Sequence, residues 1–309
     1  MKLALIALLL SATSVAAFPV TVKSCNREVT FDAAPTAAIS NDVNLTEMML
    51  VLGLRDHMVG YTGISGWKTL DPEMRDSVAE LPELSAKYPT KEVLAGADAD
   101  FFFAGWDYGM KVGGEVTPET LEPLGIKTYE LTESCIFVGA KAKSSMDDMY
   151  NDILNLGLIF GVEDKAKALV TGYKARLAEV TSGVDLANPL RVFVYDSGED
   201  TPFTAGKYAM PTALIEAAGG VNIMDDLDKS WATVAWEPVV ERNPQVIVIV
   251  NYGDVTAEQK IAFMKGNPAF ASIDAVKNNR FVVLEYVEAT PGPRNIKAVE
   301  KLVADFAAQ

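Results

Sequence analysis

The sequence predicts an α/β protein of two lobes, each with a mostly parallel sheet, joined by a single long α-helix. Three observations support this fold. Short apolar runs alternate with amphipathic segments. The alternation stops at two consecutive amphipathic helices and then restarts. The 309 residues, 49% of them hydrophobic, are enough to form two hydrophobic cores.

The first half of the chain alternates short strands with helices. In residues 41–54 the side chains of Leu45, Met48 and Leu52 share one helical face, and Gly53 ends the helix. The Phe-rich run at 101–104 is typical of a parallel strand covered on both faces. The other elements expected here are strands at 20–22, 29–31, 37–40, 59–61 and 126–131, and helical turns at 90–95 and 118–124.

Two helices separate this half from the second, in which the pattern restarts. We expect them at residues 145–160 and 163–182, and the second carries a continuous apolar stripe. The predicted organisation is therefore an N-terminal lobe over 18–162, a connecting helix over 163–183 and a C-terminal lobe over 184–309. The last lobe is expected to contain strands at 191–195, 246–250 and 281–284, and helices at 210–218, 236–242, 258–264 and 294–306.

The N-terminus predicts export. Lys2, an apolar run over residues 3–10 and small residues before Phe18 are typical of a cleaved signal peptide over 1–17. The apolar run is too short to span a bilayer, and no cysteine follows the cleavage site to carry a lipid anchor. In an oxidising compartment Cys25 and Cys135 are a candidate disulfide. Two buried thiols remain the alternative.

Composition excludes several classes of function. The formal charge of −15 is spread along the chain without a basic run, which argues against nucleic acid as a partner. His57 is the single histidine, so a multi-histidine metal site is excluded, and no phosphate-binding or nucleophile-elbow motif occurs. A secreted hydrolase would have to use Ser65 as its nucleophile and His57 as its base.

Aromatic residues gather where the predicted strands end. In open α/β sheets ligands lie outside the carboxyl ends of the strands, so a cleft between the lobes is expected there. Aromatic walls suit a large flat or partly apolar ligand. The residues that we expect at or near this cleft are Tyr61, Trp67, Trp106, Tyr108, Tyr195, Trp231, Tyr252 and Tyr286.

The order of several segments resembles one known family. APTAAISNDVNLTEMMLVLGLRDHMVGYT, YPTKEVLAGADADFFFAGW and ETLEPLGIKTYEL stand in the first half. PFTAGKYAMPTALIEAAGGVNIMDD, WATVAWEPVVERNPQVIVI and DAVKNNRFVVLE follow in the second. Together they resemble the periplasmic substrate-binding proteins of ABC importers for ferric siderophores, haem and cobalamin. That family has two Rossmann-like lobes joined by one long helix, which implies small lobe movements.

The resemblance also implies roles for individual residues. Family members dock on their permease through one surface glutamate per lobe, and the matching residues are Glu92 in PTKEVL and Glu237 in AWEPVV. Trp106 and Trp231 match aromatic residues that contact the ligand in cobalamin binders. Arg294 in GPRNI matches an arginine that faces anionic ligand oxygens in siderophore binders; its alternative role is to cap local carbonyls or to pair with Glu288.

The resulting hypothesis is a monomeric, non-enzymatic periplasmic protein. It captures an iron-siderophore-type chelate between its lobes and delivers it to an ABC permease. The protein itself needs no cofactor or resident metal, because the iron arrives chelated in the ligand. Cobalamin and haem are alternative ligands, and a sensor that reports to a membrane receptor is an alternative function.

Overall fold

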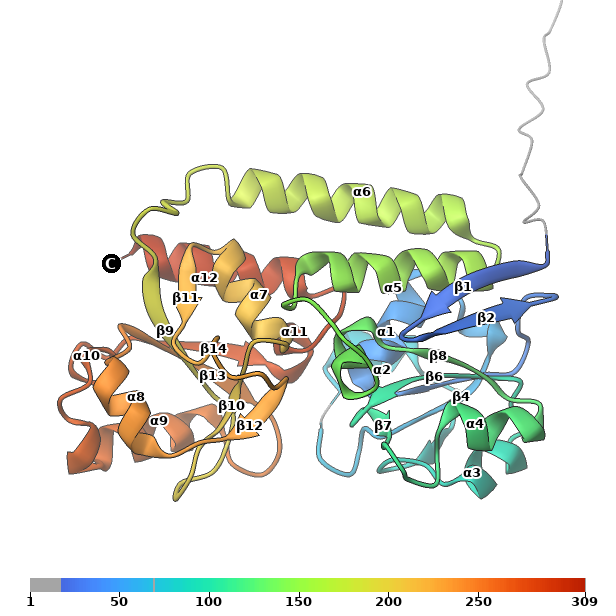
Figure 1. The fold of residues 1–309 in the computed structure, drawn as a ribbon, viewed down its shortest axis with the longest axis horizontal. Helices are drawn as coiled ribbons and strands as arrows, with labels where there is room; N and C mark the ends of the chain where they lie inside the picture. Colours follow the sequence, from blue (N-terminus) through green and yellow to red (C-terminus); the bar gives the residue numbers. More distant parts are fainter. Residues whose placement is uncertain (1–17, 69, 309) are drawn as a thin grey trace, which may run out of the picture.

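The computed structural model describes residues 18–68 and 70–308, and the predicted signal segment 1–17 lies outside them. Two α/β lobes lie side by side, and one long helix, α6 (Glu163–Val180), runs along both of them (Figure 1). The predicted fold class is confirmed. Within the described part of the chain, no helix combines the length and the apolar character needed to cross a membrane.

The N-terminal lobe is built on a six-stranded sheet whose neighbours are all parallel. Its order is β5 (Glu83–Ser85), β4 (Met58–Thr62), β3 (Ala38–Asn41), β6 (Phe101–Trp106) and β7 (Gly109–Met110), and β8 (Lys127–Glu130) also pairs with β6. An antiparallel hairpin of β1 (Val20–Ser24) and β2 (Arg27–Phe31) lies beside it. The lobe's helices are α1 (Val43–Val51), α2 (Pro72–Ser77), α3 (Lys91–Gly96) and α4 (Pro118–Leu121), with 3₁₀ turns η1 (Arg55–His57), η2 (Glu122–Leu124) and η3 (Thr132–Phe137).

The C-terminal lobe has a four-stranded parallel sheet in the order β11 (Gly220–Asn222), β9 (Leu190–Tyr195), β13 (Val246–Asn251) and β14 (Phe281–Glu285). The sequence did not predict a second feature, the antiparallel pair of β10 (Phe203–Ala205) and β12 (Trp231–Thr233). The helices are α7 (Met210–Ala217), α8 (Trp236–Arg242), α9 (Ala257–Gly266), α10 (Asp274–Lys277), α11 (Tyr286–Ala289) and α12 (Asn295–Ala307), with the 3₁₀ turn η4 (Pro268–Phe270).

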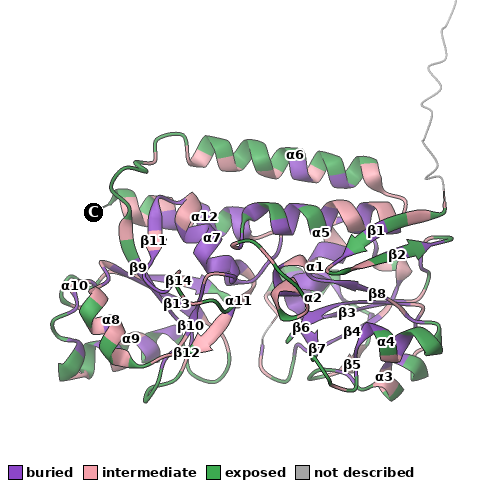
Figure 2. Cartoon of the chain, viewed as in Figure 1, coloured by how far each residue is buried: buried purple, intermediate pink, exposed green. Residues whose placement is uncertain are grey.

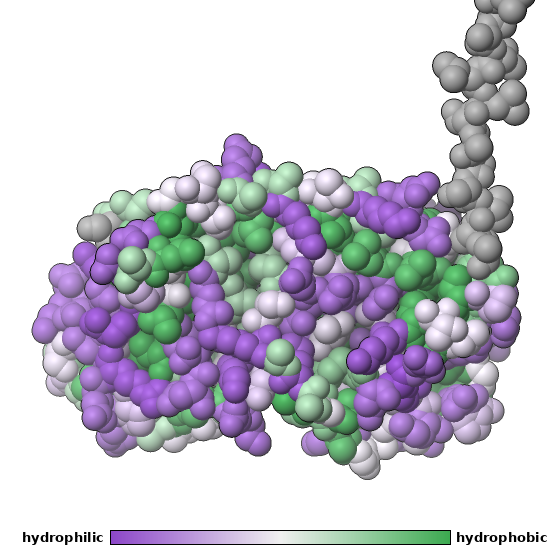
Figure 3. Space-filling model, turned by 45° about the horizontal axis from the view of Figure 1, so that its top comes forward, coloured by the Kyte–Doolittle hydropathy of each residue, from purple (hydrophilic) through white to green (hydrophobic). Residues whose placement is uncertain are grey.

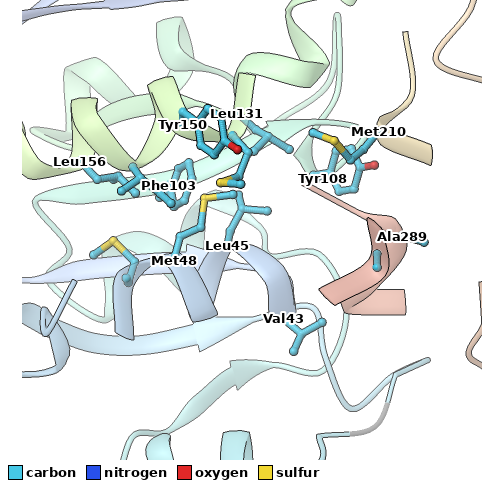
Figure 4. Close-up of a cluster of buried hydrophobic side chains, with 14 of the residues drawn as sticks. Val43, Leu45, Met48, Phe103, Tyr108, Leu131, Tyr150, Leu156, Met210 and Ala289 are labelled. Atoms are coloured by element: carbon cyan, nitrogen blue, oxygen red, sulfur yellow. The ribbon is translucent and has the colours of Figure 1, made fainter. Parts of the chain in front are cut away.

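The two lobes share part of one hydrophobic core. Tyr108 of the N-terminal lobe lies beside Met210 of the C-terminal lobe, and both belong to the same buried cluster as Ala289 (Figure 4). Buried residues therefore continue from one lobe into the other beneath α5 (Met146–Ile159) and α7 (Figure 2). Because close-packed interiors resist deformation, this shared core restricts movement of the lobes relative to each other.

The connecting helix α6 lies on the surface. Ala166 and Val170 are its buried residues, and most of its outer side is exposed (Figure 2). Arg176 pairs with Glu300 of α12 at 2.5 Å, and Lys174 pairs with Asp147 of α5 at 3.5 Å. These exposed pairs contribute little free energy, but they show that α6 contacts helices of both lobes.

Cys25 and Cys135 form a disulfide, as predicted. Cys25 stands in the turn between β1 and β2, and Cys135 lies in η3 after the sheet strand β8. The bond therefore joins the N-terminal hairpin to the segment after β8 in the same lobe, across a sequence separation of 110 residues.

Candidate ligand cleft

The carboxyl ends of the two sheets face each other between the lobes. Tyr286, directly after β14, donates a hydrogen bond of 2.8 Å from its hydroxyl to Asp42, directly after β3. The backbone N–H of Met210 donates to Glu133 Oε1 at 2.5 Å nearby. This is the arrangement in which α/β proteins bind ligands.

A cavity of about 450 Å³ lies at this junction, and we call it the aromatic cleft. Each lobe contributes a pair of rings. Trp67 and Tyr88 meet edge to face with centroids 5.1 Å apart, and Phe203 and Trp231 are stacked at 5.8 Å. The residues that line the cleft are Trp67, Lys68, Tyr88, Asp107, Tyr108 and Phe137 from the N-terminal lobe, and Asp196, Phe203, Ser230, Trp231, Val250, Tyr252, Tyr286 and Thr290 from the C-terminal lobe.

A second cavity of about 380 Å³ adjoins the aromatic cleft, and we call it the side cavity. Lys68, Tyr252 and Tyr286 line both, so these three side chains form the partition between them. The other residues that line the side cavity are Val43, Asp71, Met74, Asn251, Gly253, Thr256, Glu258, Glu285, Val287 and Arg294.

Five of the predicted aromatic residues line the aromatic cleft together. They are far apart in the sequence: Trp67, Tyr108, Tyr252 and Tyr286 follow strands of the two parallel sheets, whereas Trp231 begins β12 of the separate antiparallel pair. Their contact with a ligand stays a prediction. These residues are Trp67, Tyr108, Trp231, Tyr252 and Tyr286.

The structure corrects the expected position of Trp106. Along β6, side chains alternate between the two faces of the sheet, so Trp106 shares a face with Phe102 and Ala104. Its indole is buried there and donates to Glu130 Oε1 at 2.9 Å. Trp106 lines a separate hollow with Val112 and belongs to a different core cluster from Tyr108, which does face the cleft.

Tyr61 and Tyr195 also lie in cores instead of the cleft. Tyr61 is buried within the N-terminal core, which corrects its expected role as a stacking surface. Tyr195 packs against Trp236 at a ring distance of 5.5 Å. Trp236 itself also contacts Phe270 at 4.4 Å and donates its indole N–H to the carbonyl of Glu199 at 2.7 Å, so it packs α8 on the lobe.

Arg294 lines the side cavity but is not free to contact an anion. Its Nε donates to Glu47 Oε1 at 2.6 Å, and its Nη1 pairs with Asp71. The guanidinium thus joins α12 of one lobe to α1 and α2 of the other. Arg294 is therefore paired, as its alternative role supposed, but its partners are carboxylates of the other lobe and not Glu288, which pairs with Lys297 and Lys301.

Sequence reasoning missed a buried ion pair at the base of the cleft. Lys68 Nζ pairs with Asp42, and both side chains are almost fully buried. Burial lowers the pKa of Lys68, and the adjacent Asp42 carboxylate partly opposes that shift. The ammonium also lies over the rings of Tyr286 and Trp67, at 4.5 and 5.1 Å from their centroids.

Asp42 connects the ion pair to the fold. Its carboxylate accepts from the backbone N–H of Val43 at 2.7 Å, as the N-cap of α1, and from the hydroxyl of Tyr286. Its backbone φ of 77° is in a region that non-glycine residues rarely occupy. An Asp before a helix is a visible capping signal in the sequence. However, nothing there indicates that its second partner is Lys68, 26 residues later.

A second buried acid, Asp196, lies across the cleft. Its Oδ2 accepts from the hydroxyl of Tyr252 at 2.7 Å. Burial raises the pKa of Asp196, whereas the hydrogen bond from Tyr252 lowers it. Tyr252 is thereby held against Tyr286, at a ring distance of 5.3 Å, in the partition between the two cavities.

Glu92 and Glu237 occupy equivalent positions in the two lobes. Each is exposed and stands in the first turn of a short helix, α3 or α8, on the side of the molecule away from α6 (Figure 1). The backbone N–H of Glu92 itself lowers the pKa of its carboxyl, and the Thr90 side chain adds to this shift. The two carboxylates therefore present charge on one side of the molecule.

The structure removes the basis for a hydrolase. His57 precedes β4, where its Nδ1 lies 2.7 Å from the carbonyl of Pro35, whereas Ser65 follows the opposite end of the same strand. The backbone N–H of Ser65 donates to Glu83 at 2.8 Å. A strand of five residues is on the order of 16 Å long, so these side chains cannot act as a nucleophile and its base.

Comparison with known proteins identifies the family. The model of a family described as periplasmic binding protein matches residues 39–287. The chain belongs to this family. It is therefore an extracytoplasmic, non-enzymatic substrate-binding protein of the class that serves siderophore, haem and cobalamin uptake by ABC transporters.

Similar proteins agree with this assignment. A protein named cobalamin-binding protein from Halobacterium salinarum is 25% identical over 301 residues, which cover 94% of this chain and 74% of that protein. The structure of a periplasmic binding protein from Veillonella parvula superposes with a TM-score of 0.81 at 28% identity, covering 96% of this chain and 99% of that one. An ABC-type Fe³⁺-hydroxamate transport system from Saccharomonospora viridis gives 0.80 at 24% identity, covering 94% and 99%.

Proposed function

We propose that this binding protein captures a metal chelate or corrinoid in the aromatic cleft and delivers it to an ABC import permease. The observation that carries the proposal is that each lobe contributes one pair of rings to the same cavity. The pairs are Trp67 with Tyr88 in the N-terminal lobe and Phe203 with Trp231 in the C-terminal lobe. Such walls stabilise a flat or rounded, partly apolar ligand by stacking and by burial of apolar surface.

The names of similar proteins include cobalamin, ferric hydroxamate and haem binders, and we favour the first two ligand classes. Curated relatives are called cobalamin-binding or vitamin B12-binding proteins, and one similar structure belongs to an Fe³⁺-hydroxamate transport system. Both ligands carry a metal inside an organic shell, so the protein would contact the shell and need no metal ligands of its own. In the described residues, no three His, Cys, Asp or Glu side chains are grouped to hold a metal ion.

Delivery would use Glu92 and Glu237. One exposed carboxylate per lobe, on the side away from α6, fits a permease that presents two separated cationic groups. Two contacts, one on each lobe, fix the orientation of the docked protein, and the shared core keeps the spacing between the two carboxylates constant. The cleft opens between the two lobes that carry them.

Tryptophan fluorescence tests the ligand. Purified protein is titrated with cobalamin, ferric hydroxamate, ferric catecholate and haem, and we expect quenching by at least one at micromolar concentration because Trp67 and Trp231 line the cleft. Trp231→Phe should reduce the quenching, and Trp236→Phe, which changes a packed indole outside the cleft, should preserve it. Absence of quenching by every ligand would refute the ligand class.

Transport tests the delivery. Substitution of both Glu92 and Glu237 by Ala should abolish uptake in cells while ligand affinity stays unchanged. The matched control replaces the exposed Glu28 and Glu122 by Ala, which removes the same charge from other surfaces. Undiminished uptake by the Glu92/Glu237 variant would contradict permease docking and favour a receptor as the partner.

A further inference from the structure

We propose that the aromatic cleft selects ligands without net negative charge, that is, uncharged or cationic corrinoids and ferric hydroxamates, and disfavours anionic chelates. This inference rests on the proposed function and narrows its ligand. It differs from the expectation raised by the sequence, in which Arg294 supplies positive charge to an anionic siderophore. Among the described residues, each cation that lines the aromatic cleft or the side cavity is already paired with a carboxylate of the protein.

Acidic side chains outnumber cations on the walls. Among the described residues that line the two cavities, Lys68 and Arg294 are the cations. The carboxylates are Asp107 and Asp196 in the aromatic cleft and Asp71, Glu258 and Glu285 in the side cavity.

The positive charge of Lys68 is already compensated within the protein. Its ammonium pairs with Asp42, and its exposed fraction is 4%. The backbone carbonyl of Gly63 accepts from it at 3.3 Å, and the ring of Tyr286 covers it at 4.5 Å. An anion could reach Lys68 only by displacing Asp42, which would leave a buried carboxylate without its cation.

Two carboxylates compensate the positive charge of Arg294. Glu47 and Asp71 both pair with its guanidinium, so the group of three carries a net negative charge. The residue that resembles an anion-binding arginine in the sequence thus joins the lobes in the structure. Charge-assisted pairs of this kind are costly to break once they are partly buried.

Two further lysines lie close to the cleft, but neither lines the aromatic cleft or the side cavity. Lys260 is buried and donates a hydrogen bond of 2.6 Å to the carbonyl of Val250. Its Nζ lies 5.1 Å from the ring centroid of Tyr252. Lys87 is exposed and lies 5.7 Å from the ring of Trp67, where water and salt screen its charge.

The cleft therefore treats positive and negative ligands differently. An anionic ligand would lose its hydration and approach Asp107 and the buried Asp196 without a free cation to compensate it. An uncharged ligand avoids this repulsion. A cationic group gains from the same carboxylates and from the ring faces of Trp67 and Trp231.

A matched series of ligands tests this selectivity. One ferric trihydroxamate is used with a terminal ammonium, with that amine acetylated, and with it succinylated, so that charge changes while the iron-binding core stays constant. Cyanocobalamin and its monocarboxylic acid form a second pair. We expect the anionic member of the better-bound series to bind at least about tenfold more weakly than its uncharged or cationic counterpart, and a trianionic ferric catecholate to bind more weakly still.

Variants locate the cause of the selectivity. Replacing Asp107 and Asp196 together by Asn should reduce the difference between charged forms severalfold, and Asp56→Asn, at the exposed amino end of β4, should leave it unchanged. Anionic forms that bind as tightly as the others would overturn this inference and leave the proposed function intact. So would strong anion binding that Lys87→Met abolishes. Failure of every probe to bind would overturn both.

Discussion

The two walls of the cleft are built differently. The N-terminal wall rests on a buried ion pair, Lys68 with Asp42, inside a lobe whose hairpin is tied down by a disulfide. The C-terminal wall is formed by stacked rings and one buried acid, Asp196, in a lobe with a four-stranded sheet that lies outside the disulfide-bonded segment. Polar and apolar residues mix over the face of the molecule that Figure 3 shows. The comparison shows that two lobes of similar topology stabilise their halves of one cavity by different means.

Removal of the disulfide should cause the largest loss of stability, and the loss should be concentrated in the N-terminal lobe. Cys25→Ala with Cys135→Ala releases a loop of 110 residues, so we expect a loss of about 4–5 kcal/mol in the free energy of unfolding. Chemical denaturation measures the loss. Hydrogen exchange should quicken in β1, β2 and β8 more than in β9 and β13. Equal acceleration in both lobes would contradict the asymmetry.

Removal of the anion from the buried pair should come next. Asp42→Asn leaves Lys68 charged and buried without its partner, which costs about 3–5 kcal/mol of stability. Adding Lys68→Met to Asp42→Asn should recover a large part of that loss, because the unpaired charge is gone. Thermal or chemical unfolding of both variants measures this, with Asp56→Asn as the control. No recovery in the double variant would mean that Asp42 acts through its capping bonds alone.

The contact between the lobes should depend on pH through Glu133. Burial raises the pKa of Glu133 to about 7, although the N–H of Met210 and other partners oppose that shift. The folded protein then holds a proton that the unfolded chain releases near its ordinary pKa of about 4.5. Stability should therefore fall as pH rises between these values and stay lower above pH 7.

Glu133→Gln should remove this dependence, because the amide oxygen still accepts from Met210 and never ionises. The variant should gain roughly 2–3 kcal/mol over the wild type at pH 8 and differ little at pH 4.5. Unfolding free energies across that range measure the gain. The buried Asp152, whose pKa burial also raises to about 7, lies within the N-terminal lobe, so Asp152→Asn serves as a comparison away from the interface. A pH profile unchanged by Glu133→Gln would contradict this account.

The smallest expected change in free energy is a loss of ligand affinity, and it distinguishes the two neighbouring tryptophans of β12 and α8. Trp231→Ala should weaken ligand binding about tenfold, or about 1.4 kcal/mol, and reduce stability little, because its ring is partly exposed in the cleft. Trp236→Ala should do the reverse, since its indole packs on Phe270 and bonds Glu199. Calorimetric titration and denaturation separate the outcomes. Similar losses of affinity in both variants would refute the division of roles.

The sequence could predict much of the fold because the signals are local. Hydrophobic periodicity placed α5 and α6 and the buried strands β6, β9 and β13 within a few residues. The pair β10 and β12 was not expected, because each strand has only three residues and the two are held together by a contact far along the chain. Short strands carry too few side chains for their alternation to be visible.

The site could be predicted for residues whose place after a strand alone brings them to the cleft. It could not be predicted for residues whose side-chain direction decides whether they face the cleft. Tyr108 and Trp106 stand two residues apart after the same Phe-rich run, yet one faces the cleft and the other is buried beside Glu130. The strand ends between them, and the turn at Asp107, whose φ is 61°, redirects the chain. A difference of that kind depends on backbone dihedrals that residue type does not specify.

The sequence by itself determined the two-lobed α/β fold, the family and the presence of aromatic residues at the strand ends, because these depend on local patterns and on the order of segments. The tertiary structure alone decided how charge is distributed in the cleft. Lys68 meets Asp42, and Arg294 meets Glu47 and Asp71, across separations of 26 to 247 residues. Ion pairing is set by distance in space, and only the folded chain brings these groups together.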